Sequence, residues 1–321
     1  MALARIPALI ALHNPQNAAT PTALALGSFD GVHAGHRQVI AAAVAAAAAS
    51  PHPLVPTVLS FWPHPREVLA GEPRLRLDLP NEKLSVLGPL GIEQLVLVPF
   101  DQQLAALSPE QFVRQVLQQQ LQAKAVVIGE NFRFGHRRSG GPEDLLRLGQ
   151  ELGIAVTVVP LLDQCGSRMS SSRIRAALAA AELEEVAQLL QRPYRFQGQV
   201  VRGRGLGRGL GWPTANLQVD GRKCLPAEGV YAAWAWREGE PARPAVMNLG
   251  RQPTVDPTAP SAVEVHLLDA ELELVGHTLV VQPLKQLRVQ QAFDSLEQLS
   301  AQIGRDAQQA RELLAAAQAP G

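Results

Sequence analysis

The apolar run Ala23-Leu24-Ala25-Leu26 leads directly into Gly27-Ser28-Phe29-Asp30-Gly31-Val32-His33-Ala34-Gly35-His36, and an alanine-rich stretch follows from Arg37. This order predicts a buried strand, a glycine-rich turn and the N-terminus of a helix. The first backbone N–H groups of a helix lack partners within it, and its dipole adds partial positive charge, so such a turn favours phosphate. His33 and His36 are three residues apart, so one helical turn can direct both imidazoles at one ligand. The stretch therefore predicts a nucleotide phosphate site that the first half of the chain is built to hold.

Two other interpretations of the histidine pair remain open at this point. The imidazoles could be structural, or they could bind a metal ion together with Asp30. We favour phosphate, because two histidines within a glycine-rich strand-to-helix turn suit an anion site. In nucleotidyl transfer the nucleophile is a phosphate that the substrate already carries. The protein then mainly positions groups and stabilises spreading charge, which imidazole N–H donors can do.

Length and composition indicate a globular protein with two domains. The chain has 321 residues, 46% of them apolar, and no apolar run is long enough to span a bilayer. Its 29 basic and 29 acidic side chains balance, which argues against a general nucleic-acid binder. The two cysteines, Cys165 and Cys224, match no zinc or CxxC spacing, and the N-terminus lacks a convincing signal-peptide cleavage site. We expect free thiols, a cytoplasmic location and no nucleic-acid or membrane partner.

Strand and helix patterns alternate in the first half. Runs typical of buried strands lie at 24–28, 54–61, 95–99, 125–129 and 154–159, and helical stretches lie near 36–49, 81–90, 108–121 and 142–152. This alternation predicts a parallel sheet with helices on both faces, whose ligands bind beyond the carboxyl ends of the strands. The glycine-rich turn, Phe61–Pro65 and Gly129–Gly135 all follow such ends. Three loops should therefore converge at one edge of the sheet.

The pattern changes in the second half. Two helices near 171–180 and 182–190 precede a linker at 191–196, where Pro193 stops the helix. Short β-rich runs separated by Gly and Pro then appear at 197–202, 229–236, 244–249, 262–268 and 278–283, and 291–318 returns to helix. Such runs predict a small antiparallel barrel or sandwich. We expect two domains, 1–190 and 191–321.

Two further loops are candidates for phosphate binding. Ser170–Arg175 precedes a helix, and serine hydroxyls with arginine forks suit phosphate oxygens. The alternative is an ordinary helix cap followed by a solvated basic turn. Gly203–Gly211 is rich in glycine but satisfies neither GxGxxG nor GxxxxGK[ST], so it is no dinucleotide fingerprint and no P-loop. A flexible hairpin is the alternative there.

Three polar residues suggest a second reaction centre. Thr214 and Asn216 stand two apart on an extended segment, so they point the same way and offer two neutral oxygens to a hard cation. Glu264 lies in an alternating strand with Ala262 and His266 on its face. On the inner face of a barrel its carboxylate would be a candidate base, and an exposed glutamate is the alternative.

Nine strings carry a resemblance to one family. They are GSFDGVHAGH (27–36), FWPHP (61–65), GENFRFG (129–135), SSSRIR (170–175), RPY (192–194), GRGLGWPTAN (207–216), LPAEGVYA (225–232), NLGRQPT (248–254) and VEVHLLD (263–269). In this order they resemble the bifunctional prokaryotic riboflavin kinase/FAD synthetases across nearly the whole chain. The resemblance implies an α/β Rossmann-like nucleotidyltransferase domain, followed by a riboflavin kinase domain built on a six-stranded antiparallel β-barrel with C-terminal helices. It also implies that the chain phosphorylates riboflavin to FMN and adenylylates FMN to FAD, releasing pyrophosphate.

For the adenylyltransferase domain, the resemblance implies that His33 and His36 are catalytic and contact the ATP phosphates. The wider set that it implies for ATP and phosphate is Gly27, Phe29, Asp30, His33, His36, Asn131, Ser171, Ser172 and Arg175. His64 and Pro65 match the family's flavin-contacting loop.

For the kinase domain, Glu264 matches the family's catalytic base, which takes the proton of the ribityl 5′-hydroxyl. The positions that match its ATP and phosphate contacts are Gly207, Arg208, Thr214 and Asn216. Thr214 and Asn216 also match its Mg²⁺ ligands, so the implied cofactor is Mg²⁺ with ATP as co-substrate. The implied partners are riboflavin, FMN, FAD and ATP.

Three positions depart from the family's usual residues: Gly209, Trp212 and Val275. Trp212 keeps an aromatic surface, whereas Val275 lacks a ring and a hydroxyl that would pack in a flavin pocket. Two other functions are possible for this sequence: an enzyme with only one competent module, or a flavin-storage protein without turnover. The sequence argues against storage, because a ligand-only protein needs neither a base nor two phosphate sites.

Overall fold

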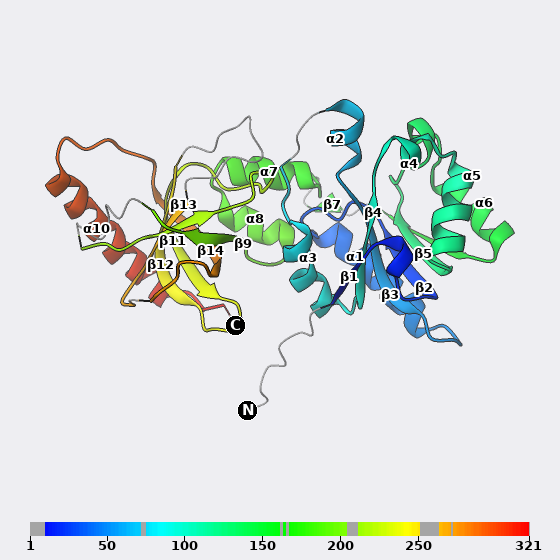
Figure 1. The fold of residues 1–321 in the computed structure, drawn as a ribbon, viewed down its shortest axis with the longest axis horizontal. Coiled ribbons are helices and arrows are strands. Elements are labelled where there is room, and N and C mark those ends of the chain that lie inside the picture. The colour runs from blue at the N-terminus through cyan, green and yellow to red at the C-terminus, as the bar shows by residue number, and fades with distance from the viewer. Residues whose placement is uncertain are drawn as a thin grey trace. The chain divides into compact units, whose positions relative to one another are not determined.

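The computed structural model describes residues 10–71, 75–160, 163–164, 167–203, 211–250, 263–270 and 272–320 (Figure 1). The chain forms two compact units. The first comprises Met1–Arg74 with Asp78–Ser171, and the second comprises Leu75–Leu77 with Ser172–Gly321. The helices at 172–190 thus count with the second unit, whereas the division expected from the sequence places them with the first.

A parallel sheet organises the first unit. Within the described residues its six strands run in the order β1-β4-β3-β2-β5-β6, and every pair is parallel. The strands are β1 (Ala11–His13), β2 (Thr22–Leu26), β3 (Val55–Trp62), β4 (Gln94–Pro99), β5 (Ala123–Gly129) and β6 (Ala155–Val159). The strand–helix alternation in the sequence is confirmed, and β1 is an edge strand that the sequence pattern did not predict.

Helices cover both faces of this sheet. The helical elements are α1 (Ala34–Ala48), α2 (Pro65–Ala70), α3 (Pro80–Leu87), α4 (Gln102–Ala106), α5 (Pro109–Phe112), the π-helical η3 (Val113–Gln120) and α6 (Pro142–Leu152). Short 3-10 turns lie at η1 (Pro15–Asn17), η2 (Gly88–Leu90) and η4 (His136–Arg138). Side chains of α1 and α3 pack against one face of the sheet, and those of α5, η3 and α6 pack against the other.

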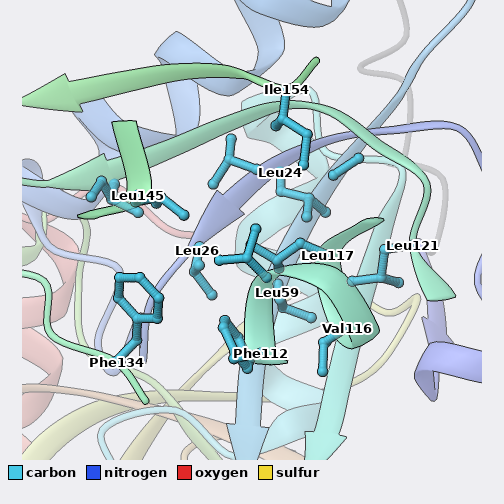
Figure 2. Close-up of a cluster of buried hydrophobic side chains, with 14 of the residues drawn as sticks. Leu24, Leu26, Leu59, Phe112, Val116, Leu117, Leu121, Phe134, Leu145 and Ile154 are labelled. Atoms are coloured by element: carbon cyan, nitrogen blue, oxygen red, sulfur yellow. The ribbon is translucent and has the colours of Figure 1, made fainter. Parts of the chain in front are cut away.

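The alternation within β2 shows how the two cores are separated. Leu24 and Leu26 join the cluster formed with α5, η3 and α6, and Figure 2 shows them beside Leu117 and Phe112. Ala25 faces the opposite cluster, formed with α1 and α3. Because successive side chains of a strand point to opposite faces, an all-apolar strand is needed where both faces are covered. This explains why Ala23–Leu26, which lead into the glycine-rich turn, are all apolar, whereas Thr22 at the start of β2 satisfies its hydroxyl by donating to the carbonyl of Leu121 at 2.8 Å.

The second unit contains a closed antiparallel barrel. Its strand order is β10-β13-β12-β11-β14-β9, with β9 pairing back onto β10. The strands are β9 (Phe196–Val201), β10 (Ala215–Gln218), β11 (Gly229–Arg237), β12 (Arg243–Leu249), β13 (Val263–Leu267) and β14 (Thr278–Arg288). The barrel is accompanied by α7 (Ser171–Ala179), α8 (Leu183–Leu190) and α10 (Leu296–Ala315), and the chain also carries a small hairpin of β7 (Asp163–Gln164) and β8 (Ser167–Arg168). The expected barrel is confirmed.

One strand face fills the barrel and the other faces α10. Tyr231, Ala233 and Met247 are completely buried on the inner face. On the outer face, Trp234 and Val246 form a buried cluster with apolar side chains of α10, and Figure 1 shows that helix beside β11 and β12. The interior of the barrel is therefore a packed core. Among the described residues, no helix is both long and apolar enough to cross a membrane.

Candidate active sites

The glycine-rich turn lies at the centre of the sheet edge. It follows β2, which is flanked by β3 on one side and β5 on the other. The chain proceeds outward from β2 in both directions, through β3 and β4 and then through β5 and β6, so β2 marks the point where the strand order reverses. Ligands of open α/β sheets bind beyond the strand ends at this point. The three loops expected to converge there follow β2, β3 and β5.

The turn after β2 is tightly constrained. Phe29 and Val32 both have a φ of 45°, and Gly31 has a φ of 90°. A left-handed backbone is costly for these two side chains, above all for a β-branched valine. Their burial, at 1% and 0% exposure, supplies the packing that holds them there. The packing thus fixes the path of the backbone from Gly27 into α1.

The two histidines lie together at the N-terminus of α1. His33 caps the helix, because its Nδ1 accepts a hydrogen bond from the backbone N–H of His36 at 3.3 Å. The two imidazoles stack with centroids 3.6 Å apart, and the edge of Phe29 supports the ring of His36 at 5.2 Å. Since Nδ1 of His33 accepts, a neutral ring carries its proton on Nε2, which makes that nitrogen the donor.

Burial keeps both rings neutral near pH 7. It lowers the pKa of His33 from 6.5 to about 4, against a smaller opposing effect of its own backbone. The pKa of His36 is lowered well below 6.5 by burial, and then by the charges of His33 and Lys83. Neutral imidazoles can donate to phosphate without adding a full charge. The metal alternative gains no support, because the described part of the chain contains no group of three His, Cys, Asp or Glu side chains placed to hold an ion.

Lys83 belongs to this site, although the sequence analysis did not select it. It lies on α3, is 6% exposed, and donates from Nζ to the carbonyl of Ser28 at 3.1 Å. A lysine on the buried face of the helix predicted at 81–90 was the available signal, because lysine is rarely buried without a purpose. Asp30, which the sequence offered as a phosphate contact, accepts the backbone N–H of Asp78 on Oδ1 at 3.4 Å, and its role toward phosphate stays a prediction.

The neighbouring loops hold their predicted residues by local contacts. His64 caps α2: its Nδ1 accepts from the N–H of Arg66 at 3.1 Å, and Pro65 is the first helical residue. Asn131 is exposed, with its Oδ1 over Gly129, where an added Cβ would lie 3.4 Å away. Both side chains follow the strands that flank β2, as the sequence predicted.

The serine–arginine segment divides between the two units. Ser171 donates from Oγ to the carbonyl of Asp30 at 2.8 Å, which ties it to the glycine-rich turn. Ser172 and Arg175 count with the second unit, where Nε of Arg175 donates to the carbonyl of Leu75 at 3.0 Å. The role of these two residues in phosphate binding stays a prediction.

A separate cavity of about 780 Å³ opens on the outer face of the barrel. The residues lining it are Arg202, Gly203, Trp212, Thr214, Asn216, Val230, Val246, Asn248, Glu264, His266, Arg288, Gln290, Gln291, Phe293, Leu299, Ile303 and Asp306. Strands supply one wall, α10 supplies another, and the segment between β14 and α10 adds Phe293. Its lining combines apolar and aromatic side chains with many polar and charged ones, as a site for a polar small molecule with an aromatic part requires.

The strand register brings the predicted kinase residues together. Asn216 on β10 is directly opposite Glu264 on β13, and Glu264 is directly opposite Asn248 on β12. Directly opposed residues point to the same face of a sheet, so these side chains form one polar row in the cavity wall. The sequence correctly grouped Glu264 with His266 and left open which face of the barrel they occupy. Both line the outer cavity, and Val263 and Val265 fill the interior.

The two halves of the chain match two protein families. Residues 15–173 match the FAD synthetase family model, and residues 190–314 match the riboflavin kinase model. A bifunctional riboflavin kinase/FMN adenylyltransferase of Escherichia coli (strain K12) is 38% identical over 290 residues, which cover 90% of this chain and 91% of that protein. This chain belongs to the bifunctional riboflavin kinase/FMN adenylyltransferase family. The family resemblance seen in the sequence is thus confirmed.

Two further proteins support this family assignment, one by its sequence and one also by its fold. The riboflavin kinase/FMN adenylyltransferase of Bacillus subtilis (strain 168) is 34% identical over 295 residues, covering 89% of this chain and 90% of that protein. A solved structure from Streptococcus pneumoniae, named as a macrolide-efflux protein, is 30% identical with a TM-score of 0.80, covering 94% of this chain and 99% of that one. The name describes that protein, and for this chain the match shows that the whole fold is shared.

Other cavity residues of this family member were not found by sequence reasoning. Arg288 on β14 forms a two-pronged ion pair with Asp306 on α10, with nitrogen–oxygen distances of 2.9 to 3.1 Å, and its guanidinium lies 5.7 Å from the ring centre of Phe293. Asn248 accepts from Gln290 Nε2 at 2.7 Å. No short motif marks such pairs, because their members come from distant parts of the chain.

The departures from the family's usual residues can be located in part. Trp212 lines the cavity and donates from its indole N–H to Ser300 Oγ at 3.2 Å, so its aromatic surface is retained. Val275 is 44% exposed and does not line this cavity, so its substitution leaves the cavity wall unchanged. Gly207, Arg208 and Gly209 lie outside the described residues.

Proposed function

We propose that riboflavin is phosphorylated in the barrel cavity and FMN is adenylylated at the glycine-rich turn. As a member of its family, the chain is a transferase that converts riboflavin to FMN and FMN to FAD, with ATP as co-substrate in both steps. The observation that carries the assignment of the first site is the pairing of Asn216 with Glu264 across β10 and β13. It brings an amide oxygen and a carboxylate to one place in a wall that otherwise has a large apolar share.

The residues of the cavity fit a magnesium ion. Thr214 and Asn216 offer neutral oxygens, and Glu264 adds one carboxylate nearby. Mg²⁺ takes oxygen ligands, keeps several waters, and commonly binds through few protein groups plus substrate phosphates. When bound, it would neutralise charge on the phosphates of ATP. We propose Thr214 and Asn216 as its protein ligands.

Glu264 has the role of base in this proposal. Its carboxylate accepts the proton of the ribityl 5′-hydroxyl as that oxygen attacks the γ-phosphorus of ATP, and ADP leaves. The apolar side chains of α10 and Phe293 hold the flavin and exclude water. The catalytic demand on the protein is therefore positioning, charge neutralisation and one proton acceptor.

At the glycine-rich turn, we propose that α1 and the two imidazoles hold the phosphates of a second ATP. The phosphate of FMN attacks the α-phosphorus, and pyrophosphate leaves. Neutral His33 and His36 donate to the oxygens on which charge increases, together with the dipole of α1. The wider contacts that we propose from the family pattern are Gly27, Phe29, Asp30, Asn131, Ser171, Ser172 and Arg175 for ATP, and His64 and Pro65 for flavin.

The two family matches support a division of labour between an N-terminal adenylyltransferase domain and a C-terminal kinase domain. We propose the cytoplasm as the location, since both steps consume ATP. Mg²⁺, the site residues and this location form one consistent hypothesis.

Glu264→Gln tests the kinase site. The amide keeps the shape and loses the proton acceptor, so FMN formation should fall by about 10²-fold or more. FAD formation from added FMN should continue at the parental rate. Purified protein is incubated with riboflavin or FMN, ATP and Mg²⁺, and the flavins are separated by chromatography.

The matched control is Glu273→Gln, because Glu273 is exposed and does not line the cavity. It should leave both rates unchanged. FMN formation by Glu264→Gln at the parental rate, or equal loss of both activities, would contradict the assignment of the base.

A further inference from the structure

His266 is a cavity residue to which the proposed reaction gives no role. It lies on β13 two residues after Glu264 and on the same face, since Val265 between them is buried inside the barrel. Thr214 is directly before β10, the strand that carries Asn216. The position of Thr214 relative to the base therefore depends on what holds the segment that enters β10.

Main-chain pairing fixes Asn216 and stops before Thr214. The ladder between β10 and β13 pairs Leu217 with Val263, Asn216 with Glu264 and Ala215 with Val265, where it ends. The next pair in this register would be Thr214 and His266. At that level the connection is made by a side chain: Nδ1 of His266 lies 2.7 Å from the carbonyl oxygen of Pro213. This hydrogen bond links β13 to the chain one residue beyond the end of the ladder, at the peptide group between Pro213 and Thr214.

The ring of His266 is held in one orientation. A carbonyl only accepts hydrogen bonds, so Nδ1 carries the proton. The rings of Trp212 and His266 form a T-shaped contact, with centroids 5.4 Å apart and an interplanar angle of 82°. The indole N–H of Trp212 in turn donates to Ser300 Oγ on α10. The segment before Thr214 is therefore fixed from two sides, by β13 and by α10.

We propose that His266 is a positioning residue that holds Thr214 where it binds Mg²⁺ during riboflavin phosphorylation. This inference rests on the proposed role of Thr214 as a magnesium ligand. His266 acts through the Pro213 carbonyl and takes no part in proton transfer to or from substrate. Mg²⁺ is small and demands near-ideal octahedral geometry, so displacing one ligand by a fraction of an ångström weakens its binding.

The test replaces His266 by asparagine or by glutamine, whose side-chain N–H₂ groups lie at different distances from the backbone. In His266→Asn the amide N–H₂ takes the place of Nδ1 and can donate to Pro213, whereas in His266→Gln it lies farther out. One net hydrogen bond is lost in the Gln variant, so the Mg²⁺ concentration that gives half-maximal FMN formation should rise about tenfold. The Asn variant should stay close to the parent. The rate of FAD formation from FMN, measured on the same samples, should be unchanged for both.

A structural role alone would not produce this pattern. Riboflavin binding without Mg²⁺, followed by quenching of flavin fluorescence, should be equal in parent, Asn and Gln variants. If the Gln variant unfolds at the assay temperature, His266→Ala replaces it, because shortening a cavity-lining side chain creates no clash. Equal Mg²⁺ dependence of the parent and the variant that lacks the donor overturns the inference.

Thr214→Val separates failure of the inference from failure of the proposed function. If His266 acts through Thr214, combining His266→Gln with Thr214→Val should cost less than the sum of the two single changes. Additive losses overturn the positioning role while leaving Thr214 as a ligand. An unchanged Mg²⁺ dependence in Thr214→Val overturns both the ligand assignment and the inference built on it.

Discussion

Gly203→Ala provides a sharp test of the kinase site, because the structure gives the displacement directly. Gly203 follows β9 and lies over the side chain of Asn216. A Cβ added there would be 2.0 Å from Nδ2 and 2.5 Å from Cγ of Asn216. Normal contacts between such atoms are about 3.5 Å, so the amide must move by more than about 1 Å.

The expected loss follows from that movement. Displacing a catalytic group by about 1 Å costs on the order of 10²-fold in rate, which corresponds to about 2.7 kcal/mol of transition-state stabilisation. The displaced group is the end of a side chain that can rotate, and alanine restricts the unfolded chain more than glycine does. We therefore expect FMN formation to fall about 10²-fold with little change in thermal stability.

The assay compares FMN formation from riboflavin with FAD formation from FMN in one sample, together with thermal unfolding. Gly304→Ala is the control, since its Cβ would meet Trp212 Cζ2 at 3.6 Å, an ordinary contact on α10. The control should keep both activities. A Gly203→Ala enzyme that makes FMN within a few-fold of the parental rate would refute the reasoning, because the amide of Asn216 would not be needed where the structure places it.

Three further predictions concern the histidine turn and the wall of the barrel cavity. His36→Ala should lower FAD formation about 10²-fold and spare FMN formation, and FAD production at the parental rate would remove this ring from the mechanism. Asp306→Ala should lower the free energy of unfolding in urea by about 1.5–3 kcal/mol, because it removes the two-pronged carboxylate partner of the half-buried Arg288 guanidinium, which keeps its bond to the Val289 carbonyl. The exposed partner of Arg311, Asp269, should cost no more than about 1 kcal/mol when truncated, and equal losses would contradict the prediction. Burial lowers the pKa of His33 from 6.5 in the unfolded chain to about 4 in the folded protein. As the pH falls, the unfolded chain therefore binds a proton at His33 before the folded protein does. The free energy of unfolding should therefore be unaffected by His33 above pH 6.5 and should fall by up to about 3 kcal/mol as the pH is lowered to 4. His33→Asn should remove this loss. A parent protein whose free energy of unfolding does not fall between pH 6.5 and 4 would refute the prediction.

Local patterns were sufficient for the elements that carry the first site. The apolar run before Gly27 predicts a strand buried on both faces, and the turn and helix after it follow from glycine and alanine content. The helix predicted near 108–121 begins after Ser108, which forms a capping box with Gln111 three residues later. These features depend on residues a few positions apart, so the sequence alone determines them.

Other elements depend on contacts that no window contains. The four residues of β10, Ala215–Gln218, include an asparagine and a glutamine, and they form a strand because β9 and β13 pair with them on either side. Phe29 and Val32 hold a left-handed backbone because the core packs against them. The sequence indicates an extended segment at 214–216, but no local pattern predicts its two pairing partners or the left-handed backbone of Phe29 and Val32.

Composition, alternation and motif spacing therefore determined that this chain has an α/β half followed by a half of short antiparallel strands, because these features are written in neighbouring residues, and the motifs predict two separate phosphate sites. Only the tertiary structure decided that β2 is central, that Lys83 lies beside the histidines, and that Glu264 faces outward under α10. Strand order, burial and barrel closure join residues far apart in the chain. Alternation shows which side chains share a face, and only closure of the barrel decides which face is inside.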